Sequence, residues 1–226
     1  MSSSPLLFVI GLPSGGTSCM AGTLHRLGFD MGRMHAIDLR NRPFGAFECL
    51  DLIRILGRYV NFGPTVTEPA GDIEAAAAYL RVYLRDRTAQ PGLQAVKYPT
   101  VQVLLSHKLA LEQPFRLIAV DRPWDDCLAS WTRRRVKAPV ADLGRFFGLL
   151  AGHREVLFRN RRPLIRVPYY GMLDQPVFWV DKLVQVLDLE PTDEQRARAV
   201  RLIRPTRRHI HPSHAHTTGL SGTRSG

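Results

Sequence analysis

Short, almost wholly apolar segments alternate along this chain with longer segments in which apolar residues recur at helical spacing. Four apolar segments have the length and the flanking turn residues of buried parallel strands, namely Leu6–Ile10, Leu93–Val96, Phe115–Val120 and Leu164–Val167. The helical pattern covers residues 17–27, 49–60, 72–87, 101–111, 125–135, 141–160, 176–187 and 192–203. This alternation predicts an α/β fold in which helices cover both faces of a central parallel sheet.

The length of 226 residues suits one sizeable domain with little room for a second. We therefore expect a single three-layer α/β domain over residues 1–211. Residues 212–226 are rich in His, Ser, Thr and Gly, and this composition predicts a disordered tail.

Charge and cysteine content narrow the classes of partner and compartment. The net charge is +11, carried by 27 Arg and 4 Lys, with seven Arg and no carboxylate from Arg196 to the end. This balance indicates an anionic ligand or partner, and a biased composition is the alternative. No nucleic-acid-binding motif is visible, which predicts no specific nucleic-acid partner. The three cysteines are widely spaced and form no CxxC pair, so we expect neither disulfides nor a metal site, and a reducing cytoplasm fits best.

No apolar run reaches the roughly 18 residues that a membrane span needs, so we expect no membrane span. The first apolar run lacks a charged segment before it and leads straight into a glycine-rich loop. It is therefore interpreted as a core strand and not as a signal peptide.

That loop, Gly11-Leu12-Pro13-Ser14-Gly15-Gly16, joins the first strand to a helix that opens with Thr17 and Ser18. Backbone N–H groups of such a loop, together with the positive end of the helix dipole, favour an anion. The spacing nearly matches the nucleoside-triphosphate P-loop, but Thr17 stands where that motif has lysine. The loop therefore predicts a P-loop-like fold and a phosphate-type ligand, and it argues against ATP hydrolysis. A glycine-rich turn without a ligand is the alternative.

Three further polar residues follow predicted strands within two positions: Lys97, Arg122 and Tyr169. Tyr169 opens a predicted turn, Tyr169-Tyr170-Gly171. Ligands of parallel α/β sheets bind outside the carboxyl ends of the strands. We therefore expect these residues to meet the glycine loop in one site.

Three segments together resemble the sulfotransferases that use 3′-phosphoadenosine 5′-phosphosulfate, in particular the bacterial branch. Gly11–Ser18 is similar to the loop that binds the 5′-phosphosulfate. Leu117–Trp131 is similar to the 3′-phosphate motif, in which an arginine follows a strand and a serine lies eight residues later. Asn41–Glu48 and Lys97-Tyr98-Pro99 are similar to two weaker elements of some bacterial members.

The resemblance implies a role for each matching residue. The residues that it assigns to the nucleotide are Ser14, Gly15, Gly16, Thr17, Ser18, Arg122, Ser130, Arg207 and Arg208. The last two belong to a basic C-terminal segment of the kind that many sulfotransferases bring over the nucleotide.

One departure concerns the leaving group. The family has Lys or Arg at the place of Ser14, where the cation helps the phosphate to depart. We expect Lys97 to replace that cation, with Arg207 and Arg208 as rivals. For the general base that takes the acceptor's proton, Glu48 comes first, followed by His35 and His107.

The sequence thus predicts transfer of a sulfuryl group from 3′-phosphoadenosine 5′-phosphosulfate, as co-substrate and without a metal, to a hydroxyl or amine. The acceptor class is a small molecule or glycan, including an anionic one. Two alternatives stay open: a P-loop kinase or NTPase, and a non-catalytic protein that binds a nucleotide or polyanion.

Overall fold

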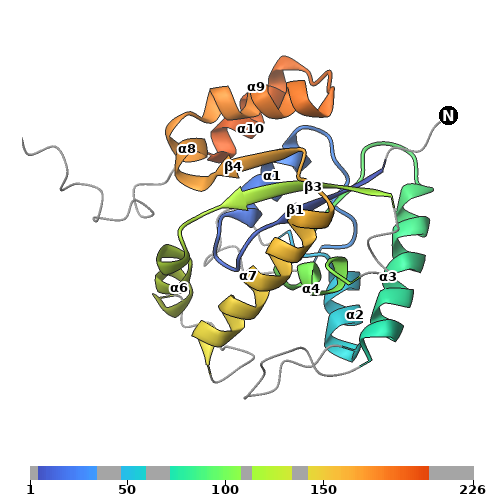
Figure 1. Cartoon of the computed structure of the whole chain (residues 1–226). Coiled ribbons are helices and arrows are strands. Elements are labelled where there is room, and N and C mark those ends of the chain that lie inside the picture. Colours follow the sequence, from blue (N-terminus) through green and yellow to red (C-terminus); the bar gives the residue numbers. More distant parts are fainter. Residues whose placement is uncertain (1–4, 35–46, 60–71, 108–113, 134–141, 204–226) are drawn as a thin grey trace, which may run out of the picture.

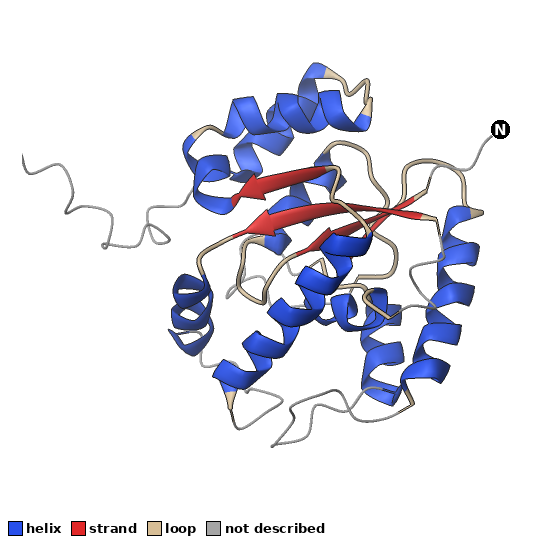
Figure 2. Cartoon of the chain, viewed as in Figure 1, coloured by secondary structure: helices blue, strands red, loops and turns tan. Residues whose placement is uncertain are grey.

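The computed structural model describes residues 5–34, 47–59, 72–107, 114–133 and 142–203. Within these ranges four strands form one parallel sheet in the order β2-β1-β3-β4 (Figures 1 and 2). The strands are β1 (Leu6–Ile10), β2 (Ala95–Lys97), β3 (Phe115–Asp121) and β4 (Ile165–Pro168). All four predicted strands are confirmed as members of one parallel sheet; β1 has the predicted bounds, and the other three have ends shifted by one or two residues.

The helices also follow the predicted pattern, except for the one expected over residues 101–111. That helix ends at Leu105, because Ser106 and His107 form a turn, and residues 108–111 lie outside the described ranges. The helices are α1 (Thr17–Arg26), α2 (Leu50–Tyr59), α3 (Ile73–Thr88), the 3₁₀ turn η1 (Pro99–Val101), α4 (Gln102–Leu105), α6 (Trp124–Arg133), α7 (Leu143–Asn160), α8 (Tyr169–Asp174), α9 (Pro176–Leu187) and α10 (Asp193–Ile203). Asp72 caps α3, since its carboxylate accepts a hydrogen bond from the amide of Ala75 at 2.8 Å.

Two predictions at the ends of strands were also wrong. Tyr169-Tyr170-Gly171 was expected as a turn but forms the first half of α8, because Pro168 has the extended conformation of a residue that precedes a helix. Lys97 was expected after its strand but is the last residue of β2, because the pairing with β1 extends to Val9↔Lys97.

Alternate side chains of the central strands enter two separate cores. Leu6, Phe8 and Ile10 of β1 pack with residues of α2, α3, α4 and α7 on one face. Leu7 and Val9 pack with residues of α1, α9 and α10 on the other face. Figure 1 shows this division, with the sheet between the two groups of helices. Helices on both faces are therefore confirmed.

None of the helices in the described residues is long and apolar enough to cross a membrane.

The carboxyl ends of the strands collect the predicted site residues. β1 leads into the glycine loop, β2 ends on Lys97, β3 leads into Arg122, and β4 leads into Tyr169. In Figure 1 the arrowheads of β3 and β4 point toward the side of the molecule on which α6 and α8 lie. His35, Arg207, Arg208 and the predicted tail 212–226 lie outside the described residues.

Candidate functional site

The glycine loop is closed so tightly that three of its positions leave no room for a side chain. A Cβ on Gly11 would lie 2.7 Å from Cγ2 of Thr17, and one on Gly15 would lie 2.7 Å from the carbonyl oxygen of Leu12. A Cβ on Gly16 would lie 2.1 Å from Cδ2 of Tyr169. All three glycines are therefore required by packing, and Gly16 is also required by its left-handed backbone conformation.

The backbone of the glycine loop and of the first two residues of α1 forms a cradle, which comprises residues 11–18. Ser14 and Gly16 both have left-handed conformations, with φ of 61° and 92°. The amide of Gly15 donates to the carbonyl of Leu12 at 2.9 Å, so this amide serves the turn itself. Gly16 stands at the N-cap position and supplies no side-chain cap to α1. The positive end of a ten-residue helix therefore faces the loop, an arrangement that suits an anion.

A buried cation lies beside this helix N-terminus. Lys97 is only 2% exposed, and its ammonium donates to Oγ of Ser18 at 3.2 Å and to Oε1 of Glu48 at 3.0 Å. The Glu48 side chain is 21% exposed. A buried lysine with this partnership differs from a solvated surface lysine. The two residues expected to serve as base and as cation thus form one ion pair beside the loop.

Arg122 lies on the other side of the loop. Its Nη1 donates to the carbonyl oxygen of Ser14 at 2.8 Å. The guanidinium also lies 4.8 Å from the ring centroid of Tyr169 and 5.6 Å from that of Tyr170. Contacts of this kind orient the planar guanidinium without neutralising its charge.

Tyr169 and Tyr170, which follow β4, contact the glycine loop and α6. The Tyr169 ring fills the space next to Gly16, and the Tyr170 hydroxyl donates to Oδ2 of Asp126 in α6 at 2.7 Å. Burial raises the pKa of Tyr170, and its hydrogen bond with Asp126 raises it further. The phenol is therefore neutral and remains a donor at neutral pH.

Ser130 lies on α6 and is 8% exposed. Cys127, three residues earlier on the same helix face, has its thiol 3.8 Å from the carbonyl oxygen of Arg122. Cys127 and Ser130 are both buried, so this face of α6 packs against the rest of the protein.

Cys19 lies in the first turn of α1, where a helix dipole could in principle favour a thiolate. Burial raises the pKa of this thiol to about 12. It is therefore protonated at neutral pH, and thiolate chemistry beside the loop is not expected.

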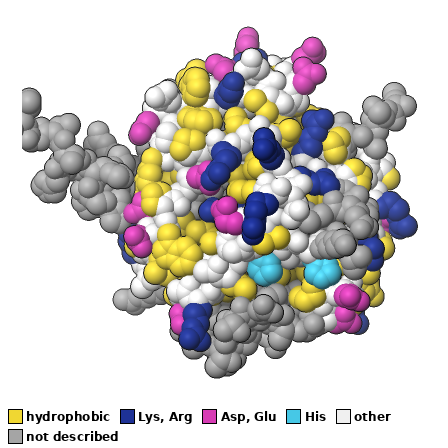
Figure 3. All heavy atoms as spheres, in the orientation of Figure 1, with side chains coloured by type: hydrophobic (Ala, Val, Ile, Leu, Met, Phe, Trp, Pro, Cys, Tyr) yellow, Lys and Arg dark blue, Asp and Glu magenta, His cyan; other side chains and the backbone are white. Residues whose placement is uncertain are grey.

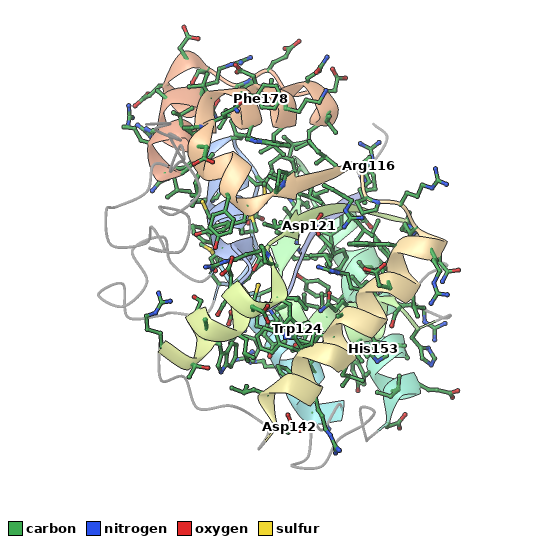
Figure 4. All side chains as sticks on the ribbon, turned by 60° about the vertical axis from the view of Figure 1, so that its left-hand side comes forward. Arg116, Asp121, Trp124, Asp142, His153 and Phe178 are labelled. Atoms are coloured by element: carbon green, nitrogen blue, oxygen red, sulfur yellow. The ribbon has the colours of Figure 1, made fainter. Side chains whose placement is uncertain are left out.

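Charges of both signs surround the site. Asp121, the last residue of β3, accepts a hydrogen bond from Nε of Arg166 at 2.8 Å and lies 3.7 Å from Arg154. Figure 3 shows Lys and Arg side chains interspersed with Asp and Glu on the face of the molecule that is turned to the viewer in Figure 1. Figure 4 shows Asp121 between the upper helices and α6, which begins at the labelled Trp124.

The structure brings together the predicted residues of the glycine loop with Lys97, Glu48 and Arg122. His107 is half-buried beyond the end of α4. Sequence reasoning missed the ion pair of Lys97 with Glu48 and the packing of Tyr169 on Gly16. The second carried a signal, because an aromatic residue after a parallel strand lies at the edge to which the loop belongs.

Within the described ranges, no group of three or more His, Cys, Asp or Glu side chains is arranged to hold a metal ion.

None of the protein-family models matches the chain, and no curated protein sequence matches it. Solved structures that are similar in fold include two sulfotransferases. The sulfotransferase domain of the olefin synthase of Synechococcus PCC 7002 is 17% identical with a TM-score of 0.44, over 86% of this chain and 76% of that domain. The sulfotransferase STF1 of Mycobacterium tuberculosis H37Rv is 11% identical with a TM-score of 0.41, over 88% of this chain and 71% of that protein. At this level of similarity, the assignment of a function rests on the residues of the site itself.

Proposed function

We propose that the chain is a sulfotransferase that takes a sulfuryl group from 3′-phosphoadenosine 5′-phosphosulfate and transfers it to a hydroxyl or amine acceptor. The observation that carries the proposal is the ammonium of Lys97 at 3.2 Å from Ser18, at the N-terminus of α1. A buried cation and a helix N-terminus that converge on one glycine loop suit a phosphate-type anion.

The two anionic groups of such a donor would bind on two sides of the glycine loop. The amides of Gly16, Thr17 and Ser18 would hold the 5′ arm, since the amide of Gly15 already serves the turn. Arg122 offers a planar fork for the 3′-phosphate, with Ser130 as a second donor on α6. Arg122 is fixed beside the loop by Ser14 and Tyr169, so its side chain loses little freedom on binding.

The donor supplies an activated sulfur. In the transfer, the acceptor oxygen or nitrogen forms a bond to sulfur while the bond from sulfur to the phosphate oxygen breaks. The electron pair of the broken bond stays on that phosphate oxygen, and the acceptor's proton passes to the carboxylate of Glu48. Lys97 stabilises the negative charge left on the phosphate, in place of the cation that Ser14 does not provide.

The Lys97–Glu48 pair fits this division of work because the two events occur on opposite sides of one sulfur atom. A cation at the leaving oxygen and a carboxylate near the acceptor must lie within a few ångströms of the same sulfuryl group. Their side chains are 3.0 Å apart. The ion pair also keeps the buried ammonium compensated before the donor arrives.

A thermal-shift panel tests the donor. The wild-type chain is heated with 3′-phosphoadenosine 5′-phosphate, adenosine 5′-phosphate, ATP and GTP, each with and without magnesium, and in a separate sample with heparin. Stabilisation by the first nucleotide without magnesium supports the proposal, because ligand that binds the folded state raises the melting temperature. Magnesium-dependent stabilisation by ATP or GTP would favour a kinase or NTPase. Stabilisation by heparin alone would favour a polyanion-binding protein.

A further inference from the structure

Glu48 is placed by its two neighbours in the chain, the half-buried Phe47 and the buried Cys49, which pack on opposite faces of the sheet. Phe47 packs against the core that contains α1 and α10. Cys49 is fully buried in the core that contains α2 and α3. Glu48, between them, points its carboxylate at Lys97. The segment 47–49 therefore crosses the carboxyl end of the edge strand β2, with one anchor on each side.

The anchor on the Cys49 side combines a backbone and a side-chain contact. The Cys49 amide donates to the carbonyl oxygen of Lys97 at 2.9 Å, which joins the segment to the end of β2. The Cys49 sulfur lies 3.1 Å from the hydroxyl oxygen of Tyr83 in α3. Burial raises the pKa of Tyr83, and the contact with Cys49 raises it further, so the phenol stays protonated and able to donate.

The anchor on the Phe47 side depends on a glycine of α1. A Cβ on Gly22 would lie 2.9 Å from Cε2 of Phe47 and 2.6 Å from Cδ2 of Leu202. Phe47 has a left-handed backbone with φ of 50°, a conformation that is uncommon for a bulky residue. Its ring is therefore held by close packing that offsets an unfavourable backbone conformation.

We propose that Phe47 and Tyr83 are positioning residues that hold the Glu48 carboxylate in place beside Lys97 and the glycine loop. Neither side chain needs to touch donor or acceptor. Phe47 acts through the chain direction that it imposes on Glu48, and Tyr83 acts through Cys49. The catalytic part of this inference rests on the proposed function, in which Glu48 takes the acceptor's proton.

Tyr83→Phe is the principal variant, because it removes only the hydroxyl and keeps the packing of the ring. Loss of the hydrogen bond between Tyr83 and Cys49, which holds Glu48 in place through Cys49, should lower kcat roughly three- to tenfold. KM for the acceptor and Kd for 3′-phosphoadenosine 5′-phosphate should stay within about twofold of wild type, because Tyr83 contacts neither ligand. Tyr79→Phe on the exposed side of α3 is the matched control and should leave all three constants unchanged.

Gly22→Ala tests the second anchor. Alanine favours a helix, but the added methyl group pushes against the Phe47 ring, so kcat should fall while Kd for the nucleotide holds. Gly57→Ala in α2 is the matched control, because a Cβ there meets nothing within 4 Å.

Two readouts separate positioning from a general loss of structure. In a Glu48→Gln background, Tyr83→Phe and Gly22→Ala should lower kcat no further, since their effect passes through the carboxylate. Hydrogen exchange at the Cys49 amide should be about tenfold faster in Tyr83→Phe, while exchange in β1 stays unchanged. This exchange experiment needs no activity, so it decides the anchoring even if the chain fails to bind the nucleotide. Equal losses with and without Glu48, or unchanged exchange at Cys49, would overturn the inference.

Discussion

Replacing Gly16 with alanine is the most direct perturbation of the cradle that leaves every charged group in place. Gly16 has φ of 92°, and a Cβ built there lies 2.1 Å from Cδ2 and 2.5 Å from Cε2 of Tyr169. Ordinary contact begins near 3.4 Å, so the Tyr169 ring must move by about 1.3 Å to admit one methyl group.

The cost of Gly16→Ala has two parts. The left-handed backbone costs alanine about 1–2 kcal/mol. Displacing the ring adds about 1–2 kcal/mol of overpacking and lost contact with Arg122, whose guanidinium lies 4.8 Å from the Tyr169 centroid. The free energy of unfolding should therefore fall by about 2–4 kcal/mol. This loss is substantial, because the total free energy of unfolding of a globular protein is roughly 5–15 kcal/mol.

Urea denaturation of Gly16→Ala, Tyr169→Ala and the double variant measures the two parts separately. The double variant should lose less than the sum of the single variants, because removal of the ring relieves the overlap and leaves the backbone term. Gly152→Ala, at a helical position with nothing within 4 Å of the added Cβ, is the control and should stabilise slightly. A loss below about 0.5 kcal/mol for Gly16→Ala, or full additivity with Tyr169→Ala, would refute the packing of Tyr169 against the loop.

Two further predictions address charge. Lys97→Met should lower turnover far more than affinity for 3′-phosphoadenosine 5′-phosphate, and unchanged turnover in steady-state assays would remove Lys97 from the mechanism. The same variant should destabilise the fold by about 2–4 kcal/mol, because the Glu48 carboxylate, which is 21% exposed, loses its cation. The hydrogen bond from the Gly32 amide, followed by the charge of Arg87, lowers the pKa of Asp30 below its ordinary value of 3.8. The ionised carboxylate therefore contributes stability that is present above that value and is lost as pH falls through the lowered native pKa. Asp30→Asn should lose less melting temperature than wild type between about pH 6 and about pH 3, and identical acid profiles would contradict this assignment.

Predictions from the sequence were most accurate for features that depend on a single residue type with a single structural role. Apolar runs bounded by turn residues located the four strands, and the glycine spacing located the loop, because only glycine accepts the contacts at positions 11, 15 and 16. The placement of Lys97 and Arg122 at one sheet edge followed from the rule that parallel strands share a direction. These features are local, or they depend only on the class of fold.

Contacts between individual side chains of distant segments could not be predicted from the sequence. Lys97 and Glu48 are 49 positions apart, and each was assigned a role without the other. Their contact depends on the path of segment 47–49 across the edge of β2, which follows from the left-handed conformation of Phe47 and the buried contact of Cys49 with Tyr83. Neither feature leaves a periodic pattern. The predicted turn at Tyr169 was wrong for a related reason, because Pro and Gly punctuate helix starts as well as turns.

The central claim is that the cradle binds a nucleotide with separate 5′ and 3′ anionic groups, the second held by Arg122. Isothermal titration without metal measures it directly, with 3′-phosphoadenosine 5′-phosphate and adenosine 5′-phosphate titrated into wild type, Arg122→Ala and the control Arg116→Ala. Arg116 is an exposed arginine near the opposite end of the same strand (Figure 4). Arg122→Ala should weaken the first nucleotide by roughly 10- to 150-fold, corresponding to about 1.5–3 kcal/mol, and the second by much less, while Arg116→Ala changes neither. Equal losses for both nucleotides in Arg122→Ala, or no binding of either nucleotide to wild type, would contradict the claim.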